Sequence, residues 1–487
     1  MEYDVTIGLE VHAQILTASK MFCGCSAAYA NAAPNTHVCP VCLGLPGALP
    51  VINRRAIELA ALTGLALNCT IQADNWISRK NYFYPDLPAN YQRSQYDDPL
   101  CVRGWLEIAG PDGPKRIGIT RVHIEEDTGK LNHAPDGATL VDFNRAGVPL
   151  MEIVSEPDIA SPEEARRYFQ KLRQILMWIG VNTGNMEEGA LRCDANVSVR
   201  PRGQRAYGAK VEIKNINSFR NVERALAYEV ERQIRELEAG RPIRQTTRGW
   251  NDAAGRTVEQ RTKEYAEDYR YFPEPDIPPL QITPGWVEAR RAELPELPDA
   301  RKARFVAAYG LSDYDAEVLT GERADSDYFE RVVAALPPGV TPKDAANWIS
   351  GELFRLLKES GESLAEAGAR MRPAYVGEVQ ALLNAGTITR TSAKEVFEIC
   401  FREGRAPAEI VAERGLAVIG AGDALDTLAR EVIAAHPKAV AEYRGGKAAS
   451  IKFLVGQVMK ATRGQANPQA AQEALERALH AEPAKDG

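Results

Sequence analysis

Gly8-Leu-Glu-Val-His-Ala-Gln14 alternates polar and apolar side chains close to the start of the chain. Residues two apart in an extended strand project from the same face, so Glu10 and His12 share one face. Leu9 and Val11 fall on the opposite face. The alternation therefore predicts a strand with an apolar side packed on a core and a second side that carries charged groups.

The same alternation recurs in four later segments, which we interpret as further strands: 117–124, 148–154, 193–199 and 211–216. The polar positions in these segments, or within two residues of their ends, are His123, Glu125, Glu152, Glu156, Asp194, Asn196, Ser198, Glu212 and Lys214. One face of the resulting sheet should be rich in carboxylates, which repel one another and are costly to bury unless cations neutralise them. Mg²⁺ prefers oxygen ligands and often bridges carboxylates to nucleotide phosphates, so the pattern favours a Mg-ATP site. A solvated face with ordinary surface acids is the alternative.

Positive side chains concentrate in the same part of the chain. Phosphoryl transfer needs positive charge where negative charge builds on the phosphate oxygens. The candidates for phosphate contacts are Arg79, Lys80, Arg192, Lys214 and Arg261. Each of them, taken alone, is more often a surface cation or a salt-bridge partner.

Familiar nucleotide-binding motifs do not account for such a site. The chain has no Gly-x4-Gly-Lys-[Ser/Thr] sequence, and Gly446-Lys447 lacks both the upstream glycine and the following hydroxyl. The segment 418–425 imitates a dinucleotide fingerprint, but Leu425 stands where the third glycine belongs. An ATP site in this protein must therefore be of a different kind.

Four of the eight cysteines fall within twenty residues. Cys23 and Cys25 form one close pair, and Cys39 and Cys42 form a second pair after thirteen intervening residues. Two thiol pairs separated by a loop are typical of a tetrahedral Zn²⁺ site, and four protein ligands leave no open position for catalysis. The loop 23–42 is therefore expected to hold a structural zinc ion. Unligated or redox-active cysteines are the alternative, although the thioredoxin-like context for redox activity is missing.

The size of the chain predicts several domains. At 487 residues it exceeds one compact core, and about 150 residues per domain suggests three. The Pro- and aromatic-rich stretch 268–284 cannot continue a helix or a central strand, and Ala, Glu, Leu and Arg dominate after it. We expect an α+β catalytic domain at 1–292, an all-α domain at 293–405 and a small helical tail domain at 406–487.

Two helices of the first domain have clear end signals. The first starts with Ser161 as its N-cap and Glu164 completing a capping box, and its apolar stripe stops at Gly180. The second runs from Ser218 to Gly240. Both are expected to pack on one side of the sheet as scaffold.

The charge and hydropathy of the sequence indicate in which compartment the protein is expected and how it could bind nucleic acid. No apolar run reaches the ~20 residues that cross a bilayer, and acidic residues stand where a signal peptide would be basic. We expect a cytoplasmic protein without membrane contact. The net charge of -7 argues against a generally basic surface, so any nucleic acid should bind through a local patch.

The tail supplies such a patch. Its basic residues between 438 and 463 share that segment with a single acid, Glu442, and a buried apolar stripe would turn them toward solvent. The residues that we expect to contact nucleic acid are Lys447, Lys452, Lys460 and Arg463. A solvated helix face without a ligand is the alternative.

Several long motifs together resemble those of a known family, in the same order. They are Gly8-Leu-Glu-Val-His12, Arg79-Lys-Asn-Tyr-Phe-Tyr-Pro-Asp86, His123-Ile-Glu-Glu-Asp127, Asp142-Phe-Asn-Arg-Ala-Gly147, Glu152-Ile-Val-Ser-Glu-Pro-Asp158, Met186-Glu-Glu-Gly189, Leu191-Arg-Cys-Asp-Ala-Asn196, Lys214-Asn-Ile-Asn-Ser-Phe219 and Asp268-Tyr-Arg-Tyr-Phe-Pro-Glu-Pro-Asp276. The chain is similar over essentially its whole length to the B-subunit family of the bacterial aspartyl/glutamyl-tRNA amidotransferases.

The resemblance implies a fold, a reaction and partners. The fold would be a cradle-shaped antiparallel-sheet domain, related in topology to glutamine synthetase and guanido kinases, followed by a helical domain and a tail that contacts the outer corner of tRNA. The reaction would be Mg-ATP-dependent phosphorylation of the side-chain carboxylate of Glu-tRNA(Gln) or Asp-tRNA(Asn), followed by displacement of the phosphate by ammonia. An amidase-type A subunit would release that ammonia from glutamine, and a small C subunit would complete a heterotrimer.

The family motifs also imply roles for individual residues. Metal coordination is assigned to Glu10, His12, Glu125 and Glu152, with Glu126, Asp194 and Lys214 nearby in the catalytic centre. The zinc cysteines occur in some members of the family and not in others, so their presence is compatible with it.

Two interpretations from other functional classes remain open at this point. One is a non-catalytic zinc-ribbon module that binds RNA, which leaves the acidic strand faces unexplained. The other is a metal-dependent hydrolase that uses the carboxylates and His12. The sequence does not tell which of the two mischarged tRNAs is the substrate.

Overall fold

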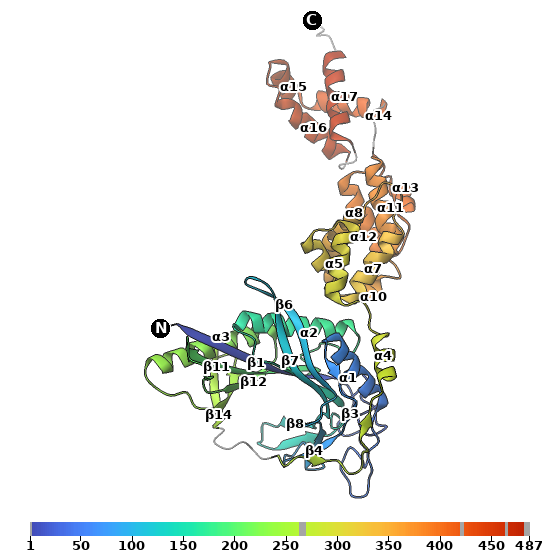
Figure 1. The fold of residues 1–487 in the computed structure, drawn as a ribbon. Coiled ribbons are helices and arrows are strands. Elements are labelled where there is room, and N and C mark those ends of the chain that lie inside the picture. The colour runs from blue at the N-terminus through green and yellow to red at the C-terminus, as the bar shows by residue number, and fades with distance from the viewer. Residues whose placement is uncertain (1, 263–268, 419–422, 463–465, 482–487) are drawn as a thin grey trace. The chain divides into compact units, whose positions relative to one another are not determined.

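The structure, a computed structural model, describes residues 2–262, 269–418, 423–462 and 466–481 (Figure 1). At 215, 261, 262, 423, 424 and 481 only the backbone is described. The chain divides between 297 and 298 into two compact units. Each unit is described by itself below.

A large sheet dominates the first unit. In the described residues it has nine strands in the order β14-β13-β12-β11-β1-β10-β7-β6-β2. Their bounds are β1 Tyr3–Gln14, β2 Thr70–Ile71, β6 Cys101–Gly110, β7 Gly113–Glu126, β10 Pro149–Ser155, β11 Leu191–Pro201, β12 Val211–Ile216, β13 Thr246–Asn251 and β14 Arg256–Thr262. The five segments predicted as strands are all strands of this sheet.

One pairing departs from the expected antiparallel sheet. Strand β12 pairs with β13 in parallel, whereas the other neighbours are antiparallel. Parallel neighbours need a crossover connection, and helix α3 (Phe219–Glu238) supplies it between these two strands. The strand Thr246–Asn251 was not predicted from the sequence, so this crossover was missed.

Helices α1 (Arg54–Ala66), α2 (Pro162–Trp178) and α3 pack on one face of the sheet (Figure 1). The strand residues on that face are fully buried, as Leu9 and Val11 of β1 illustrate. They form one core with the apolar stripes of the helices. Because neighbouring residues of a strand point to opposite faces, the polar positions of the same strands lie on the face away from these helices.

The ends of α2 follow the predicted signals with one difference. The Ser161 hydroxyl accepts a hydrogen bond from the Glu164 backbone N–H at 3.1 Å, which confirms the N-cap. The Glu164 carboxylate, however, accepts from the Ala160 N–H at 2.8 Å, so the reciprocal bond of the capping box goes to the residue before the cap. Beyond the helix, Gly180 has φ +71°, which a residue with a side chain rarely adopts.

Helix α3 has the ends that its sequence predicts. Its N-cap is Ser218, whose hydroxyl accepts from the Asn221 N–H at 3.1 Å, and Gly240 follows the helix with φ +70°.

Smaller sheets lie beside the large one. They are β15-β4-β5 (Phe272–Pro273, Ser78–Asn81, Tyr91–Ser94), β16-β3 (Leu280–Gln281, Asp74–Asn75) and β8-β9 (Lys130–His133, Thr139–Asp142). Strand β5 contacts β7 of the large sheet. The stretch 272–281, which the sequence marked as irregular, thus pairs with segments nearly two hundred residues earlier, and α4 (Pro284–Arg291) closes the unit.

The second unit is helical throughout its described residues. Its elements are α5 Pro298–Tyr309, α6 Asp313–Leu319, α7 Arg323–Ala334, α8 Pro342–Trp348, η1 Ile349–Leu353, α9 Phe354–Ser360, α10 Leu364–Ala367, α11 Pro373–Asn384, α12 Arg390–Glu403, α13 Pro407–Arg414, α14 Asp423–Ala435, α15 Pro437–Arg444, α16 Ser450–Ala461 and α17 Pro468–Ala481. They enclose two separate hydrophobic clusters, one within 305–416 and one within 425–479. None of the helices in the described parts of the chain is long and apolar enough to span a bilayer.

Candidate active site

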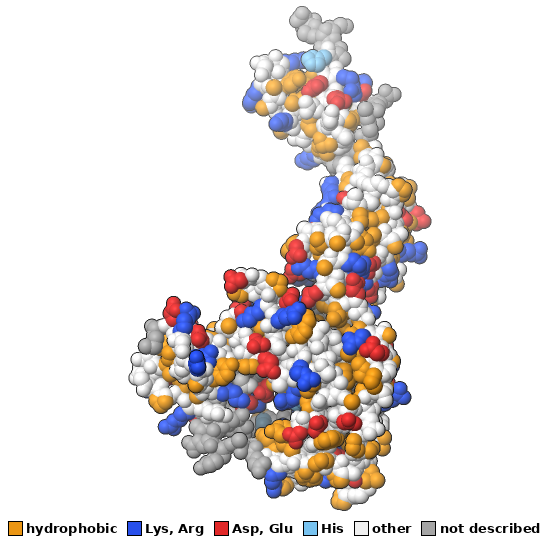
Figure 2. All heavy atoms as spheres, viewed as in Figure 1, with side chains coloured by type: hydrophobic (Ala, Val, Ile, Leu, Met, Phe, Trp, Pro, Cys, Tyr) orange, Lys and Arg blue, Asp and Glu red, His pale blue; other side chains and the backbone are white. Residues whose placement is uncertain are grey.

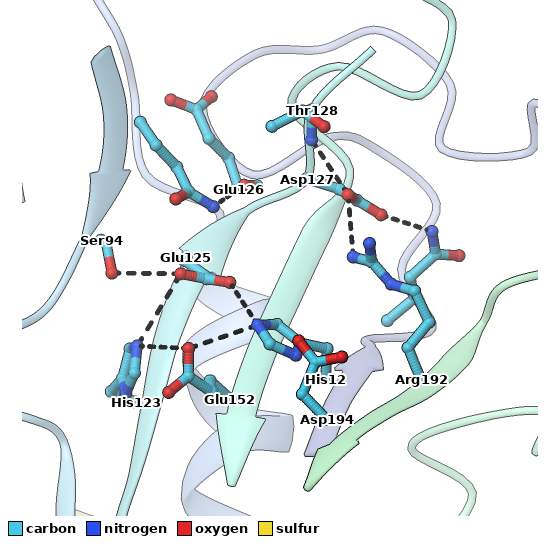
Figure 3. Close-up of polar contacts among 12 residues, drawn as sticks. His12, Ser94, His123, Glu125, Glu126, Asp127, Thr128, Glu152, Arg192 and Asp194 are labelled. Carbon is cyan, nitrogen blue, oxygen red and sulfur yellow. Dashed lines mark hydrogen bonds and ion pairs between the residues drawn. The ribbon is translucent and has the colours of Figure 1, made fainter. Parts of the chain in front are cut away.

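The strand register aligns four polar side chains across the sheet. Arg192 of β11 lies opposite His12 of β1, His12 lies opposite Glu152 of β10, and Glu152 lies opposite His123 of β7. Glu125 follows His123 by two residues and so shares its face. Figure 3 shows the side chains of His12, His123, Glu125 and Glu152 directed toward one another, while Arg192 points to Asp127. The sequence pattern thus becomes one continuous polar row.

Three members of this row converge. His12 Nε2 lies 3.3 Å from Glu152 Oε2 and 3.7 Å from Glu125 Oε1. One ligand atom from each residue lies within 4.8 Å of the other two. Two carboxylates and an imidazole at this spacing fit a divalent cation, which would also compensate the repulsion between the acids.

The electrostatics keep both acids ionised. Burial alone would raise the pKa of Glu152, but His123, His12 and Arg121 together lower it well below its usual range. Burial likewise opposes ionisation of Glu125, and the hydrogen bond from His123 with the charge of His12 lowers its pKa. Burial would depress the pKa of His12, yet the hydrogen bond and charge of Glu152, with Glu125, raise it. Two anionic oxygen donors therefore face one shared space.

Neighbouring groups fix the orientation of the two acids. His123 Nε2 lies 3.8 Å from an oxygen of each acid, and Arg121 Nε donates to His123 Nδ1 at 3.2 Å. The Ser94 hydroxyl donates to Glu125 Oε2 at 3.2 Å (Figure 3). Ser94 belongs to β5, so the small sheet contributes to the site, and no motif in the sequence pointed to this residue.

Glu10 faces a second group of charges. It lies opposite Asp194 across β1 and β11, and its Oε1 accepts a hydrogen bond from Asn196 at 2.8 Å. Lys214 Nζ lies 2.9 Å from Asp194 and 3.4 Å from Glu212. Burial would lower the pKa of Lys214, but these two carboxylates raise it, so the ammonium stays charged. Among the described residues, Glu10 is not part of the group that converges with His12.

Arg192 ends the polar row on the other side. Its Nη2 lies 3.1 Å from Asp127 Oδ1, and Gln14 Nε2 donates to the second oxygen of the same carboxylate at 2.8 Å. Burial would raise the pKa of Asp127, but Arg192 and Arg145 lower it. Asp127 stands within a quoted family motif that gave it no role, and its position beside Arg192 makes it part of the candidate site.

Arg79 and Glu126 belong to a buried ion-pair chain. Arg93 Nη1 lies 3.1 Å from Glu126 Oε1, and its Nε lies 3.2 Å from Glu274 Oε2. Arg79 Nε donates to the same Glu274 oxygen at 2.9 Å. Burial raises the pKa of Glu126, although Arg93 opposes the shift. Both predicted site residues thus have charged partners within the protein. Arg93 was not predicted from the sequence, and Glu274 stands within a quoted motif that gave it no role.

The two remaining predicted phosphate contacts lie on other elements. Lys80 of β4 places its Nζ 5.0 Å from the ring centroid of Tyr269 and 5.8 Å from that of Tyr82, which are cation–π contacts. Arg261 lies in β14, and its side chain is outside the described part of the structure. Of the five candidate cations, Arg192 and Lys214 are the two whose described contacts adjoin the polar row.

The predicted zinc cysteines come together. The Sγ atoms of Cys23, Cys25, Cys39 and Cys42 all lie within 4.8 Å of one another. Four thiols in one cluster fit the ligand set of a tetrahedral Zn²⁺ ion. The group lies apart from the carboxylate row in sequence and shares no ligand with it.

Helix α16 has an exposed side and a buried side. Lys452 and Lys460 are exposed, and its own residues Ile451, Leu454 and Val458 are buried. Lys447 Nζ lies 3.0 Å from Glu442, the one acid of that segment. Arg463 lies outside the described residues. Figure 2 shows Lys and Arg interspersed with Asp and Glu over the visible face of the first unit.

Two protein-family models match this chain, one within each of its two compact units. A model of the GatB/GatE catalytic domain matches residues 5–288, and a model of the GatB domain matches residues 327–479. Similar proteins include the B subunit of the aspartyl/glutamyl-tRNA(Asn/Gln) amidotransferase of Roseiflexus sp. (strain RS-1), 76% identical over 99% of this chain and 100% of that protein. The B subunit of the same enzyme in Herpetosiphon aurantiacus is 58% identical over 99% of this chain and 100% of its own. That of Dehalococcoides mccartyi (strain ATCC BAA-2266 / KCTC 15142 / 195) is 49% identical over 98% and 99%.

Proposed function

Because the chain belongs to the family of aspartyl/glutamyl-tRNA(Asn/Gln) amidotransferase B subunits, we propose that its first unit phosphorylates the side-chain carboxylate of a mischarged aminoacyl-tRNA. The chain is thus a subunit of a glutamine-dependent tRNA amidotransferase, which is a ligase of translation. The substrates would be Glu-tRNA(Gln), Asp-tRNA(Asn) or both.

The chemistry proceeds in two steps. A carboxylate oxygen of the acyl group attacks the γ-phosphorus of ATP, the bond to the β,γ-bridging oxygen breaks, and ADP leaves. The resulting acyl phosphate is a good acyl donor, whereas the free carboxylate is not. Ammonia then attacks the carbonyl carbon, phosphate departs with the electron pair of the C–O bond, and the amide forms after loss of a proton.

The converging trio of His12, Glu125 and Glu152 carries this proposal. These residues would hold Mg²⁺, and the ion would supply positive charge to neutralise the charge that builds during phosphoryl transfer. His123, Arg121 and Ser94 orient the trio through the contacts given above.

Other charged groups are assigned around the trio. We place Glu10, Asp194 and Lys214 at the catalytic centre, with the Lys214 ammonium beside the incoming phosphate. Arg192 is the second phosphate contact, positioned by Asp127. For Arg79 and Glu126 the ion pairs with Glu274 and Arg93 favour a structural role.

The rest of the chain fits the proposed assembly. The cysteine group would hold a structural Zn²⁺ ion. An amidase-type A subunit would supply ammonia, a C subunit would complete a heterotrimer in the cytoplasm, and the tail would contact tRNA. We retain a cradle-shaped catalytic domain at 1–292, a helical domain at 293–405 and a tail domain at 406–487 as parts of the proposal.

The decisive experiment uses the complete chain with its partner subunits and a mischarged tRNA. Radiolabelled ATP should transfer its γ-phosphoryl group to Glu-tRNA in the absence of glutamine, and amide should form when glutamine is added. Omitting ATP should abolish both. A module that only binds RNA would retain tRNA without phosphoryl transfer, and a hydrolase would act without ATP, so either result would refute the proposal.

A further inference from the structure

Lys20 is a fully buried lysine next to the cysteine group. Its exposed fraction is 0%, and it follows β1 at the start of the segment that leads to Cys23. A buried ammonium is costly unless hydrogen bonds and a counter-charge compensate it. Among the described residues, the proposed phosphorylation site provides no counter-charge for the Lys20 ammonium, so its hydrogen bonds and counter-charge must come from other neighbours.

Three acceptors surround the ammonium. Lys20 Nζ donates to the carbonyl oxygen of His37 at 2.7 Å, to that of Phe143 at 3.3 Å, and to Cys42 Sγ at 3.6 Å. The two carbonyls satisfy hydrogen bonds but carry no charge. Of the three, the sulfur alone can be an anion, and the ion pairs of the described residues include none between Lys20 and a carboxylate.

We propose that Lys20 balances the charge of the cysteine centre and positions it against the large sheet. Four thiolates around one Zn²⁺ ion carry a net negative charge, and an N–H donated to a ligand sulfur reduces it. The inference rests on the proposed zinc site, and it assigns to Lys20 a role beyond the four ligands. Lys20 is a positioning residue, because it acts through Cys42.

The same lysine connects the cysteine group to the catalytic sheet. Phe143 begins a short turn that ends at Gly147, whose N–H donates to the Asp127 carbonyl at 2.8 Å. The Gly147 carbonyl accepts from the Met21 N–H at 2.7 Å, directly after Lys20. Since Asp127 pairs with Arg192, the contacts run without interruption from the cysteines to the end of the polar row.

The lysine stem and Cys42 both lie next to this turn. Gly147 has φ +85°, and a Cβ atom built there would make ordinary van der Waals contact with Cys42 Cβ and with Lys20 Cδ, at 3.5 Å from each. The lysine stem therefore packs beside both the cysteine loop and the turn. Replacement by methionine keeps most of the volume of the stem while it removes the charge and the three donated hydrogen bonds.

The test measures metal retention in the full-length chain. Lys20→Met should release zinc to a chromogenic chelator at least about tenfold faster than the wild type, as expected when a group that supports a metal ligand is lost. Lys115→Met is the control, since it removes a partly buried lysine that lies 2.7 Å from Glu164 and outside the cysteine loop. Its release rate should equal that of the wild type.

A charge-specific rescue separates this role from simple packing. Cys25→His lowers the negative charge of the centre by one while it keeps four ligands. The double variant Lys20→Met/Cys25→His should therefore retain metal better than Lys20→Met alone, and its Co²⁺ form should show a thiolate-to-cobalt absorption band. If Lys20→Met fails to fold, recovery of a folded, metal-containing chain in the double variant supports the proposal, and no recovery overturns it.

The outcomes distinguish this inference from the proposals on which it stands. A wild-type chain that contains no metal when purified without chelators would refute the zinc site and this inference together. A metal-containing wild type whose release rate equals that of Lys20→Met would overturn the role of Lys20 alone. Phosphoryl transfer to tRNA by the wild type is a separate assay, so neither result bears on the proposed activity.

Discussion

Buried charges of this protein are compensated in two different ways at the level of single residues. Glu125 and Glu152 are held near one imidazole with a shared space between them, which suits an added cation. Glu126, one residue from Glu125, is instead paired internally with Arg93. Since neighbouring residues of a strand point in different directions, adjacent glutamates can have unrelated functions.

Glu152→Gln tests the metal trio. The amide keeps the shape but loses the charge that would bind the cation, so acyl phosphate formation should fall at least about 100-fold. The affinity for mischarged tRNA, measured by filter binding, should change little. Glu156→Gln is the control, because this exposed glutamate lies just beyond the same strand, and it should retain the rate. An unchanged rate in Glu152→Gln would exclude the trio as the metal site.

Arg93→Met tests the ion-pair chain. The substitution leaves Glu126 buried without a cation, while Glu274 keeps its pair with Arg79, and breaking a buried pair costs about 3–5 kcal/mol of stability. The thermal unfolding transition of the first unit should shift down accordingly. Arg54→Met removes an exposed pair with Glu58 and should have little effect. Equal shifts in the two variants would contradict the assigned role of Arg93.

The sequence reveals some site residues better than others for a physical reason. His12, Glu125 and Glu152 were found because the two-residue period of a strand places side chains on a known face. Arg93 and Glu274 are 181 residues apart, and the motif that contains Glu274 gives no sign of its partner. Their contact depends on the pairing of β15 with β4, which single-sequence periodicity does not contain.

The helices of the first unit were more predictable than its sheet. The ends of α2 and α3 depend on hydrogen bonds within a few residues, so Ser161, Ser218 and Gly240 could be recognised directly. Strand β13 reads Thr-Thr-Arg-Gly-Trp-Asn and has no clear apolar alternation. The parallel β12-α3-β13 crossover could not be predicted, because strand order depends on contacts between distant segments.

Asp325→Asn tests a feature of helix α7. Burial, together with the nearby Glu322, raises the pKa of Asp325 from 3.8 to about 7. The folded state therefore holds this proton more tightly than the unfolded state, and the contribution of the group to stability is lost as pH rises from about 4 to about 7. The variant should unfold at a higher temperature than the wild type at pH 8, with a smaller difference at pH 5.

The control for this prediction lies on the same helix. Asp327 forms an ion pair with Arg301 at 2.6 Å, so Asp327→Asn should lower the unfolding temperature at pH 8. Circular dichroism at both pH values measures the transitions. A loss of stability in Asp325→Asn at pH 8 would show that its carboxylate is better accommodated than its burial implies.

For the molecule as a whole, hydrophobic cores indicate how the chain is partitioned. The buried apolar clusters fall within 7–277, 305–416 and 425–479. The chain divides into two compact units between residues 297 and 298, so the second unit contains two of these clusters. Chain length and composition suggested several domains because one core cannot grow indefinitely. The boundaries at 292 and 405 remain predictions, since composition changes gradually where a linker is short.

The last prediction concerns the net charge of -7 and the affinity for a polyanion. A chain of this charge should repel tRNA at long range, so binding must come from local contacts such as the exposed Lys452 and Lys460 of α16. Each phosphate that a lysine neutralises releases a counterion and contributes to the salt dependence of binding. Changing both lysines to glutamate should therefore weaken tRNA binding at least about tenfold at low salt and reduce the slope of log K against log salt by about two. Lys358→Glu, an exposed lysine of α9, should leave the slope unchanged. If all three substitutions reduce binding equally per charge, the effect comes from net charge, and α16 is not a tRNA contact.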